Sequence, residues 1–174
     1  MLTVKFDHLP IGPETLFLDA GSGFGRHAFE AARQGARVVA LDYATDEIAV
    51  TQATFAAMAE AGEINPDRLA GVIRGDATCL PFRDSSFDCI VTSEVLEHVR
   101  DDVRALSEIS RVLQPGGIFV ATVPSWFPEK INWMLSDEYH APFVAGGHLR
   151  IYSASELKSK IRDAGLLLRG THRA

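Results

Sequence analysis

The chain of 174 residues has a formal net charge of -6, with 47% hydrophobic and 23% charged residues. This length fits a single domain with its own core, and the negative charge argues against a nucleic-acid substrate, which needs clustered lysine and arginine. The sequence has no apolar run of transmembrane length, no signal peptide and no lipidation motif, so we expect a cytoplasmic protein without a membrane span.

The first predicted elements are a strand, a glycine-rich loop and a helix. Residues 15–20 form a short apolar run, a glycine cluster follows, and residues 26–34 form an alanine-rich helical pattern. Glycines alternate from Gly21 to Gly25, but Arg26 occupies the position that would complete the dinucleotide fingerprint G-x-G-x-x-G. We therefore expect the loop to approach something other than a pyrophosphate.

Asp19 lies at the end of the first strand and indicates the charge of the ligand. A charge pair at about 4 Å and an effective dielectric near 20 is worth about 4 kcal/mol, attractive for a cation and repulsive for an anion. S-adenosylmethionine carries an ammonium and a sulfonium and has no phosphate, whereas nicotinamide and flavin dinucleotides are anionic. The pattern favours S-adenosylmethionine. A plain strand-to-helix turn, with glycines needed only for geometry, is the alternative.

The second apolar run, residues 37–42, ends in another acid. Asp42 follows Gly25 by about 17 residues, close to the spacing at which a second strand delivers a carboxylate to a ribose. We expect Asp42 to accept hydrogen bonds from the ribose hydroxyls and Tyr43 to contact the adenine. An acid that only stabilises a helix N-terminus is the alternative for Asp42.

The remaining pattern alternates helices and strands. Helices are predicted over 45–61 and 101–113, and strands over 69–77, 87–93 and 118–124. This alternation predicts an α/β fold: a doubly wound, mostly parallel sheet with helices on both faces, in which ligands bind at the carboxyl ends of the strands. That rule places four strand-end residues on one edge of the sheet: Asp19, Asp42, Asp76 and Ser93.

The D-x-G-x-G-x-G turn is followed, in order, by L-P-F, F-D-x-I, E-V-L-E-H-V and L-x-P-G-G. The pattern covers about residues 14–165 and resembles the class I S-adenosylmethionine-dependent methyltransferases, especially the group that includes ubiquinone and menaquinone biosynthesis enzymes. The resemblance implies a Rossmann-like fold and S-adenosylhomocysteine as the product. It also implies that Asp76 and the backbone of Ala77 contact the adenine. A plain Asx turn is the alternative for Asp76. The predicted cofactor residues are Asp19, Gly21, Ser22, Gly23, Gly25, Asp42, Tyr43, Asp76, Ala77 and Ser93.

Residues 125–150 lack a clean periodicity and are rich in aromatic and histidine side chains. A long segment of this kind in a compact domain is typically a lid or binding loop, so we expect it on the acceptor side. Aromatic side chains suit a flat or apolar small molecule, and packing on the core is the alternative. A capping box at 153–156 then predicts a helix that Gly165 ends. The side chains concerned are Trp126, Trp133, Tyr139, His140 and His148.

The most reactive-looking cluster is E-V-L-E-H. A helical turn beginning at Glu94 would place Glu94, Glu97 and His98 on one face, where they could bind a divalent cation. In some small-molecule and RNA O-methyltransferases an E-x-x-E-H of this kind binds metal together with a later histidine, and His148 stands where that histidine would fall. The motif also occurs widely in the superfamily without metal, so metal is the less favoured interpretation. Without metal, His98, His140 or His148 could act as a general base or serve a structural role.

Residues 166–172 predict a sixth strand, and the seventh, antiparallel strand that this fold normally adds is expected to be missing. We expect a single domain over 1–174, monomeric or homodimeric, that transfers a methyl group from S-adenosylmethionine to an O, N or C atom of a small molecule. One alternative is a non-catalytic subunit that binds the cofactor. The other is a nicotinamide-dependent oxidoreductase, against which Asp19 and Arg26 count.

Overall fold

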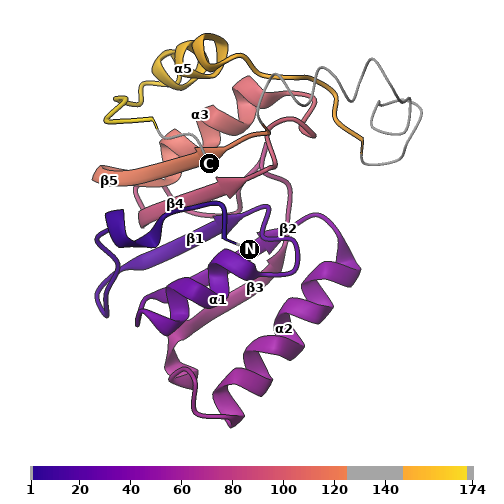
Figure 1. Ribbon diagram of the computed structural model, residues 1–174, viewed down its shortest axis with the longest axis vertical. Helices are drawn as coiled ribbons and strands as arrows, with labels where there is room; N and C mark the ends of the chain where they lie inside the picture. The colour runs from indigo at the N-terminus through magenta and orange to yellow at the C-terminus, as the bar shows by residue number, and fades with distance from the viewer. Residues whose placement is uncertain (1, 125–146, 172–174) are drawn as a thin grey trace.

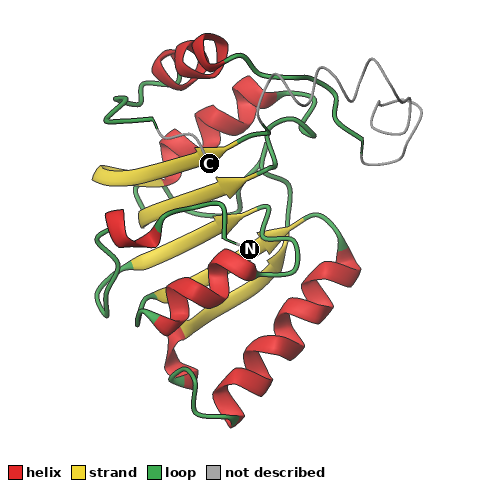
Figure 2. Ribbon diagram, viewed as in Figure 1, coloured by secondary structure: helices red, strands yellow, loops and turns green. Residues whose placement is uncertain are grey.

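The computed structural model describes residues 2–124 and 147–171 (Figures 1 and 2). Most of the predicted acceptor-side segment, including both tryptophans, Tyr139 and His140, lies outside the described residues. None of the described helices combines the length and the apolar character needed to cross a membrane. The strands and α-helices, in chain order, are β1 (Leu16–Ala20), α1 (Arg26–Arg33), β2 (Arg37–Asp42), α2 (Thr45–Glu60), β3 (Leu69–Arg74), β4 (Phe87–Ser93), α3 (Asp102–Val112), β5 (Leu113–Thr122) and α5 (Ala154–Asp163).

The five strands form one sheet in the order β3-β2-β1-β4-β5, and every adjacent pair is parallel. β1 is central and pairs with β2 from Leu16 opposite Arg37 to Ala20 opposite Leu41. Both faces of this sheet are covered, which explains why the strands read as continuous apolar runs rather than alternating ones. All carboxyl ends therefore meet at one edge, where the arrowheads lie in Figure 1.

Helices cover both faces of the sheet. Successive strand residues point to opposite sides, so they pack against different helices. Phe17 packs with Ala28 of α1 and Phe55 of α2, whereas the next residue, Leu18, packs with Ile109 of α3. Burial of such a large apolar side chain contributes about 1.5–3 kcal/mol. On the α3 side, Leu157 of α5 packs against a third cluster. The predicted doubly wound α/β fold is confirmed.

Three predicted strands differ from the observed ones, the smallest difference being that β3 ends at Arg74 rather than at residue 77. The predicted sixth strand over 166–172 is wrong in its described part: residues 166–171 belong to no strand, and Leu167 is 91% exposed. An apolar triplet after a glycine has the composition of a strand, but a strand also needs a neighbour that satisfies its backbone groups. β5 begins at Leu113 rather than at 118, and the register shift that follows Phe87 opposite Leu113 absorbs residues 114–117.

Candidate functional site

The loop between β1 and α1 is held against the end of β2. The N–H groups of Gly21 and Ser22 donate to the carbonyl oxygen of Leu41, at 2.7 and 3.0 Å. Gly21 adopts a φ of 84°, and a Cβ atom there would lie 2.3 Å from Cγ2 of Val95 in the loop after β4. The Val95 side chain therefore packs directly against the backbone of the glycine loop, which it can do only because residue 21 is glycine.

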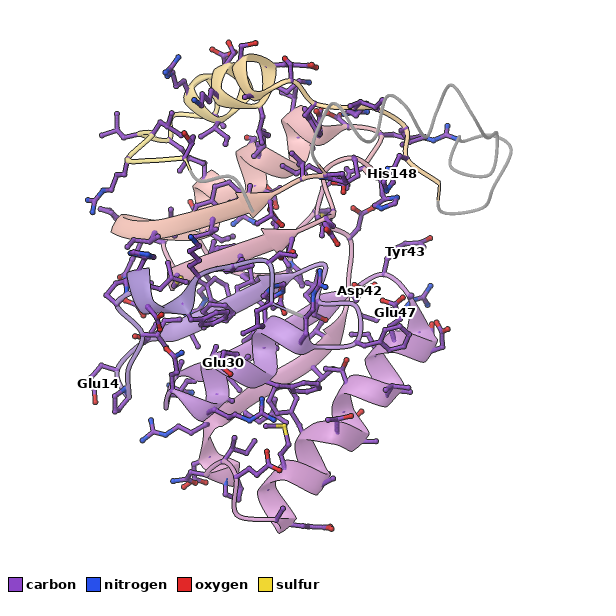
Figure 3. All side chains as sticks on the ribbon, in the orientation of Figure 1. Glu14, Glu30, Asp42, Tyr43, Glu47 and His148 are labelled. Atoms are coloured by element: carbon purple, nitrogen blue, oxygen red, sulfur yellow. The ribbon has the colours of Figure 1, made fainter. Side chains whose placement is uncertain are left out.

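Asp42 joins this loop to the end of β2. Its Oδ2 accepts from the N–H of Gly23 at 2.8 Å, and its Oδ1 accepts from the N–H of Ala44 at 2.9 Å. The two bonds fix the carboxylate at the carboxyl edge of the sheet, where Figure 3 labels it close to Tyr43 and Glu47. This is the edge where the ribose was predicted to bind.

Sequence reasoning missed Glu47, which lies in the first turn of α2. Its Oε2 would be 3.3 Å from a Cβ atom on Gly23, so the carboxylate borders the glycine loop. Burial raises the pKa of Glu47, and the negative charges of Asp42 and Asp46 raise it further. The sequence signal that could have identified Glu47 is its position, because it is an acid in the first turn of the helix that follows the predicted ribose-binding strand. The edge is therefore more acidic than the strand-end residues alone indicate.

Asp19 lies deeper than predicted. Its side chain is fully buried, its Oδ2 accepts from the N–H of Ala28 at 3.0 Å, and its Oδ1 has no hydrogen-bond partner in the described part of the chain. Burial raises the pKa of Asp19 to about 7, although the Ala28 hydrogen bond opposes the change. A residue with no exposed surface cannot touch a ligand at the edge without rearrangement, so here Asp19 supports the start of α1.

The predicted adenine residues lie at the ends of β2 and β3. Oδ1 of Asp76 accepts from the N–H and the hydroxyl of Thr78, both at 2.8 Å, which is the Asx turn considered as the alternative. Ala77 is 9% exposed, whereas Tyr43 is 70% exposed, with the guanidinium carbon of Arg74 5.4 Å from its ring centroid. These positions are compatible with an adenine site. The contacts of Tyr43, Asp76 and Ala77 with the adenine remain predictions.

Ser93, at the end of β4, belongs to a hydroxyl cluster that the sequence did not reveal. Its Oγ lies 2.6 Å from Oγ1 of Thr3 and 2.8 Å from Oγ1 of Thr122, and Thr3 in turn lies 3.2 Å from Nε2 of His27. Burial, together with the charge of nearby Arg26, lowers the pKa of His27 to about 4, so this imidazole is neutral at pH 7. No sequence pattern marked Thr3, because its role depends on where the N-terminal segment folds.

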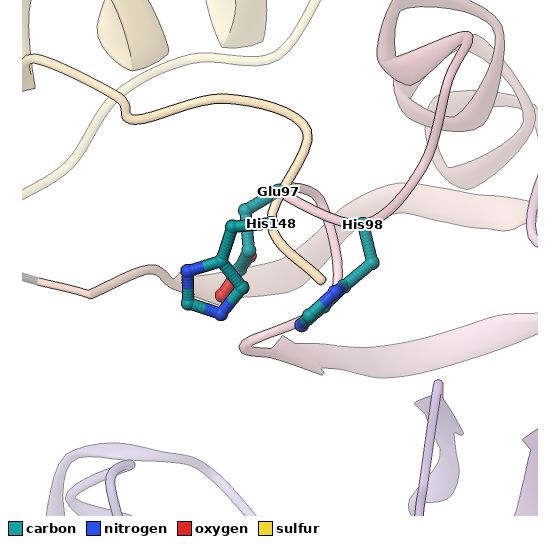
Figure 4. Close-up of side chains that lie close together, drawn as sticks. All are labelled: Glu97, His98 and His148. Carbon is teal, nitrogen blue, oxygen red and sulfur yellow. The ribbon is translucent and has the colours of Figure 1, made fainter. Parts of the chain in front are cut away.

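Glu97, His98 and His148 meet beside the same edge (Figure 4). One ligand atom of each lies within 4.8 Å of the other two; Glu97 is buried and His98 is exposed. The two imidazole centroids are 4.6 Å apart at an interplanar angle of 72°, and the N–H of Leu149 donates to the Glu97 carbonyl oxygen at 2.8 Å. The structure thus brings together two of the predicted base candidates and an acid.

The predicted convergence of Glu94 with this group is wrong, because no helical turn begins there. Glu94 has a left-handed φ of 57°, and its Oε2 lies 3.1 Å from Nη2 of Arg26. The left-handed residue redirects the chain after β4, so the i, i+3, i+4 spacing does not apply. His148 reaches the cluster from the segment before α5, as the later histidine of the family pattern, so the group consists of Glu97, His98 and His148 without Glu94.

Comparisons with known proteins agree with this geometry. Residues 18–121 match the family model described as a methyltransferase domain. The chain is similar to a demethylmenaquinone methyltransferase of Beutenbergia cavernae, at 35% identity over 161 residues that span 90% of this chain and 62% of that protein.

Solved structures are similar as well. One is a chain of the complex between the Haloferax volcanii Trm112 methyltransferase activator and the putative methyltransferase, with a TM-score of 0.72 and 26% identity over 92% of this chain and 65% of that one. Another is the [4+2]-cyclase SpnF, with a TM-score of 0.70 and 26% identity over 92% of this chain and 53% of that one. This chain spans less than two thirds of each of these relatives. Because the family model covers more than half of its residues, the chain belongs to the class I S-adenosylmethionine-dependent methyltransferases.

Proposed function

We propose that this domain binds S-adenosylmethionine at the carboxyl edge of its sheet and transfers the methyl group to a small molecule. The observation that carries the proposal is the Asp42 carboxylate, fixed beside the glycine loop by the N–H groups of Gly23 and Ala44. A carboxylate held in this way is ready to accept from a ribose diol without further ordering.

The residues around Asp42 fit the rest of the cofactor. Tyr43, Asp76 and Ala77 follow the ends of β2 and β3 at the same edge, which supports an adenine beside them. In the glycine loop, the Ser22 hydroxyl is buried and has no hydrogen-bond partner among the described residues. Buried polar atoms are normally paired, so an unpaired hydroxyl in a ligand-binding loop supports a ligand that completes it.

The bound cofactor supplies a sulfonium, which is a good leaving group for the methyl carbon. The protein's contribution is therefore to align the acceptor atom and to exclude water. The relatives named as demethylmenaquinone methyltransferases support a flat, apolar acceptor such as a quinone-type ring. The [4+2]-cyclase with a similar fold is a reminder that the fold alone does not fix the reaction.

We expect the Asp42→Asn variant to bind S-adenosylhomocysteine about 100-fold more weakly, because two charge-assisted hydrogen bonds to the ribose are lost. Isothermal titration calorimetry measures the change, with Asp46→Asn on α2 as the matched control, expected within about twofold of the unaltered protein. An unaltered protein that binds NADH and not S-adenosylhomocysteine would overturn the proposal. Binding without methyl transfer to any of a panel of quinols, phenols and amines would favour the non-catalytic alternative.

We also propose that Glu97, His98 and His148 hold a divalent cation that orients the acceptor. Imidazole and carboxylate donors suit first-row cations such as Zn²⁺, Mn²⁺ and Fe²⁺, and three ligand atoms within 4.8 Å of one another can surround one ion. Three protein ligands leave coordination positions open for an acceptor oxygen. The same residues without metal would instead offer a histidine base.

Manganese titration by calorimetry separates these two roles. We expect the unaltered protein to bind Mn²⁺, and Glu97→Gln or His148→Ala to weaken binding at least about tenfold, since each removes one of three ligands. Glu63→Gln, an isosteric change on the exposed partner of Arg33, is the control. If the unaltered protein binds none of Mn²⁺, Zn²⁺ and Mg²⁺, the metal proposal fails and the histidine base remains.

A further inference from the structure

The ion pair between Arg26 and Glu94 lies where the cofactor loop meets the end of β4. Arg26 is the first residue of α1, directly after Gly25, and Glu94 directly follows Ser93. Nη2 of Arg26 is 3.1 Å from Oε2 of Glu94, and β1 and β4 are neighbours in the sheet. The side chains are 42% and 45% exposed, so both charged groups are open to a ligand.

The backbone of Glu94 is held in an unusual conformation. Among the described residues, Ser85 and Glu94 are the non-glycine residues with positive φ, and Glu94 has a φ of 57°. Its N–H donates to the Thr122 carbonyl oxygen at 2.9 Å, which fixes the residue on the end of β5. Such conformations cost free energy and concentrate at ligand sites, because the surrounding structure must maintain them.

Stability does not account for this arrangement. An exposed ion pair contributes little to folding, so a strained glutamate facing an arginine gains too little from the pair to explain the strain. A ligand that carries a separate positive and negative charge would gain more binding free energy from these two side chains than folding gains from their ion pair. An arginine guanidinium can bind a carboxylate with two parallel hydrogen bonds, and a carboxylate accepts from an ammonium.

We propose that Arg26 and Glu94 together recognise the zwitterionic amino-acid end of the cofactor, with Arg26 on its carboxylate and Glu94 on its ammonium. This inference rests on the proposed function. Asp19, predicted from the sequence to face the positive charge, is fully buried and therefore leaves the ammonium to another acid. Glu94 is the acid that the structure exposes at the neighbouring strand end.

Two ligands that differ only in this end test the assignment. S-adenosylhomocysteine carries the amino-acid end, and 5′-methylthioadenosine lacks it but keeps the adenosine and the sulfur. We expect Arg26→Gln and Glu94→Gln each to weaken S-adenosylhomocysteine binding about tenfold while 5′-methylthioadenosine binding stays within about twofold, because only the charge-assisted contacts are lost. Calorimetry gives both dissociation constants for each variant.

Arg33→Gln is the matched control, because Arg33 lies on the same helix and forms an ion pair of the same 3.1 Å length with Glu63. It should change neither affinity. Equal weakening of both ligands by Arg26→Gln would mean that the pair only supports the loop, and an unchanged ratio of the two affinities would equally overturn the inference. If the unaltered protein binds neither ligand, the proposed function itself fails; if it binds both with the same affinity, only the present inference does.

Discussion

Gly21→Ala should cause the largest loss of cofactor binding of any single change in the glycine loop. The substitution puts a side chain on a residue with a φ of 84° and places its Cβ 2.3 Å from Cγ2 of Val95. The left-handed conformation alone costs an alanine about 1–2 kcal/mol, and the overlap with the Val95 side chain forces that side chain or the glycine loop to move. We expect the affinity for S-adenosylhomocysteine to fall at least about 100-fold, which corresponds to about 2.8 kcal/mol.

Gly62→Ala is the control, because it places an alanine in a left-handed conformation without creating a steric overlap. Gly62 has a φ of 72°, but a Cβ atom there would meet nothing within 4 Å. Its substitution should lower the thermal midpoint slightly and leave cofactor binding intact. If Gly21→Ala keeps the affinity of the unaltered protein, Val95 does not limit the loop as described, and the close approach has no role in binding.

The sequence predicted the elements around the glycine loop because their causes are local. β1, α1 and β2 match their predicted ranges within one residue, since an apolar run, a glycine turn and an alanine-rich helical stripe each act over a few residues. β5 was placed too late because a Pro-Gly-Gly sequence normally interrupts structure. Here Leu113 pairs with Phe87 before that sequence, and the register shift accommodates the insertion.

The candidate site was predicted less completely, because its contacts join segments far apart along the chain. Nothing in the spacing around Glu94 indicates its left-handed φ or its pairing with Arg26. His148 was suggested by a family pattern, but its approach to Glu97 depends on how the segment before α5 folds back. The burial of Asp19 depends on α1 packing over β1, which strand-end reasoning does not resolve.

The buried carboxylate of Asp102 anchors residues 147–153, the segment that carries His148 and leads into α5. Asp102, in the first turn of α3, is 3% exposed and forms ion pairs with Arg150 at 2.7 Å and Lys160 at 2.8 Å. It also accepts a short hydrogen bond from the hydroxyl of Tyr152. Asp102 thus ties α3 to both the segment after residue 147 and helix α5.

Replacing Asp102 by asparagine should lower the free energy of unfolding by about 3 kcal/mol, because two cations and a buried hydroxyl lose their charged partner. Urea unfolding followed by circular dichroism measures the change. Asp84→Asn is the control, since Asp84 also pairs with an arginine, at 2.8 Å, but its side chain is 77% exposed. Its effect should not exceed about 1 kcal/mol.

The pH dependence identifies the charge of Asp102 as the cause. Burial alone would raise its pKa, but hydrogen bonds from Lys160, Tyr152 and Arg150 outweigh it and lower the pKa from 3.8 to about 2. A lowered folded-state pKa stabilises the protein fully above the unfolded value and loses this effect as the pH falls from about 4 towards 2. The unaltered protein and Asp102→Asn should therefore converge in thermal midpoint below pH 4. A constant difference from pH 6 to 3 would show that packing, and not the carboxylate charge, holds the segment that carries His148.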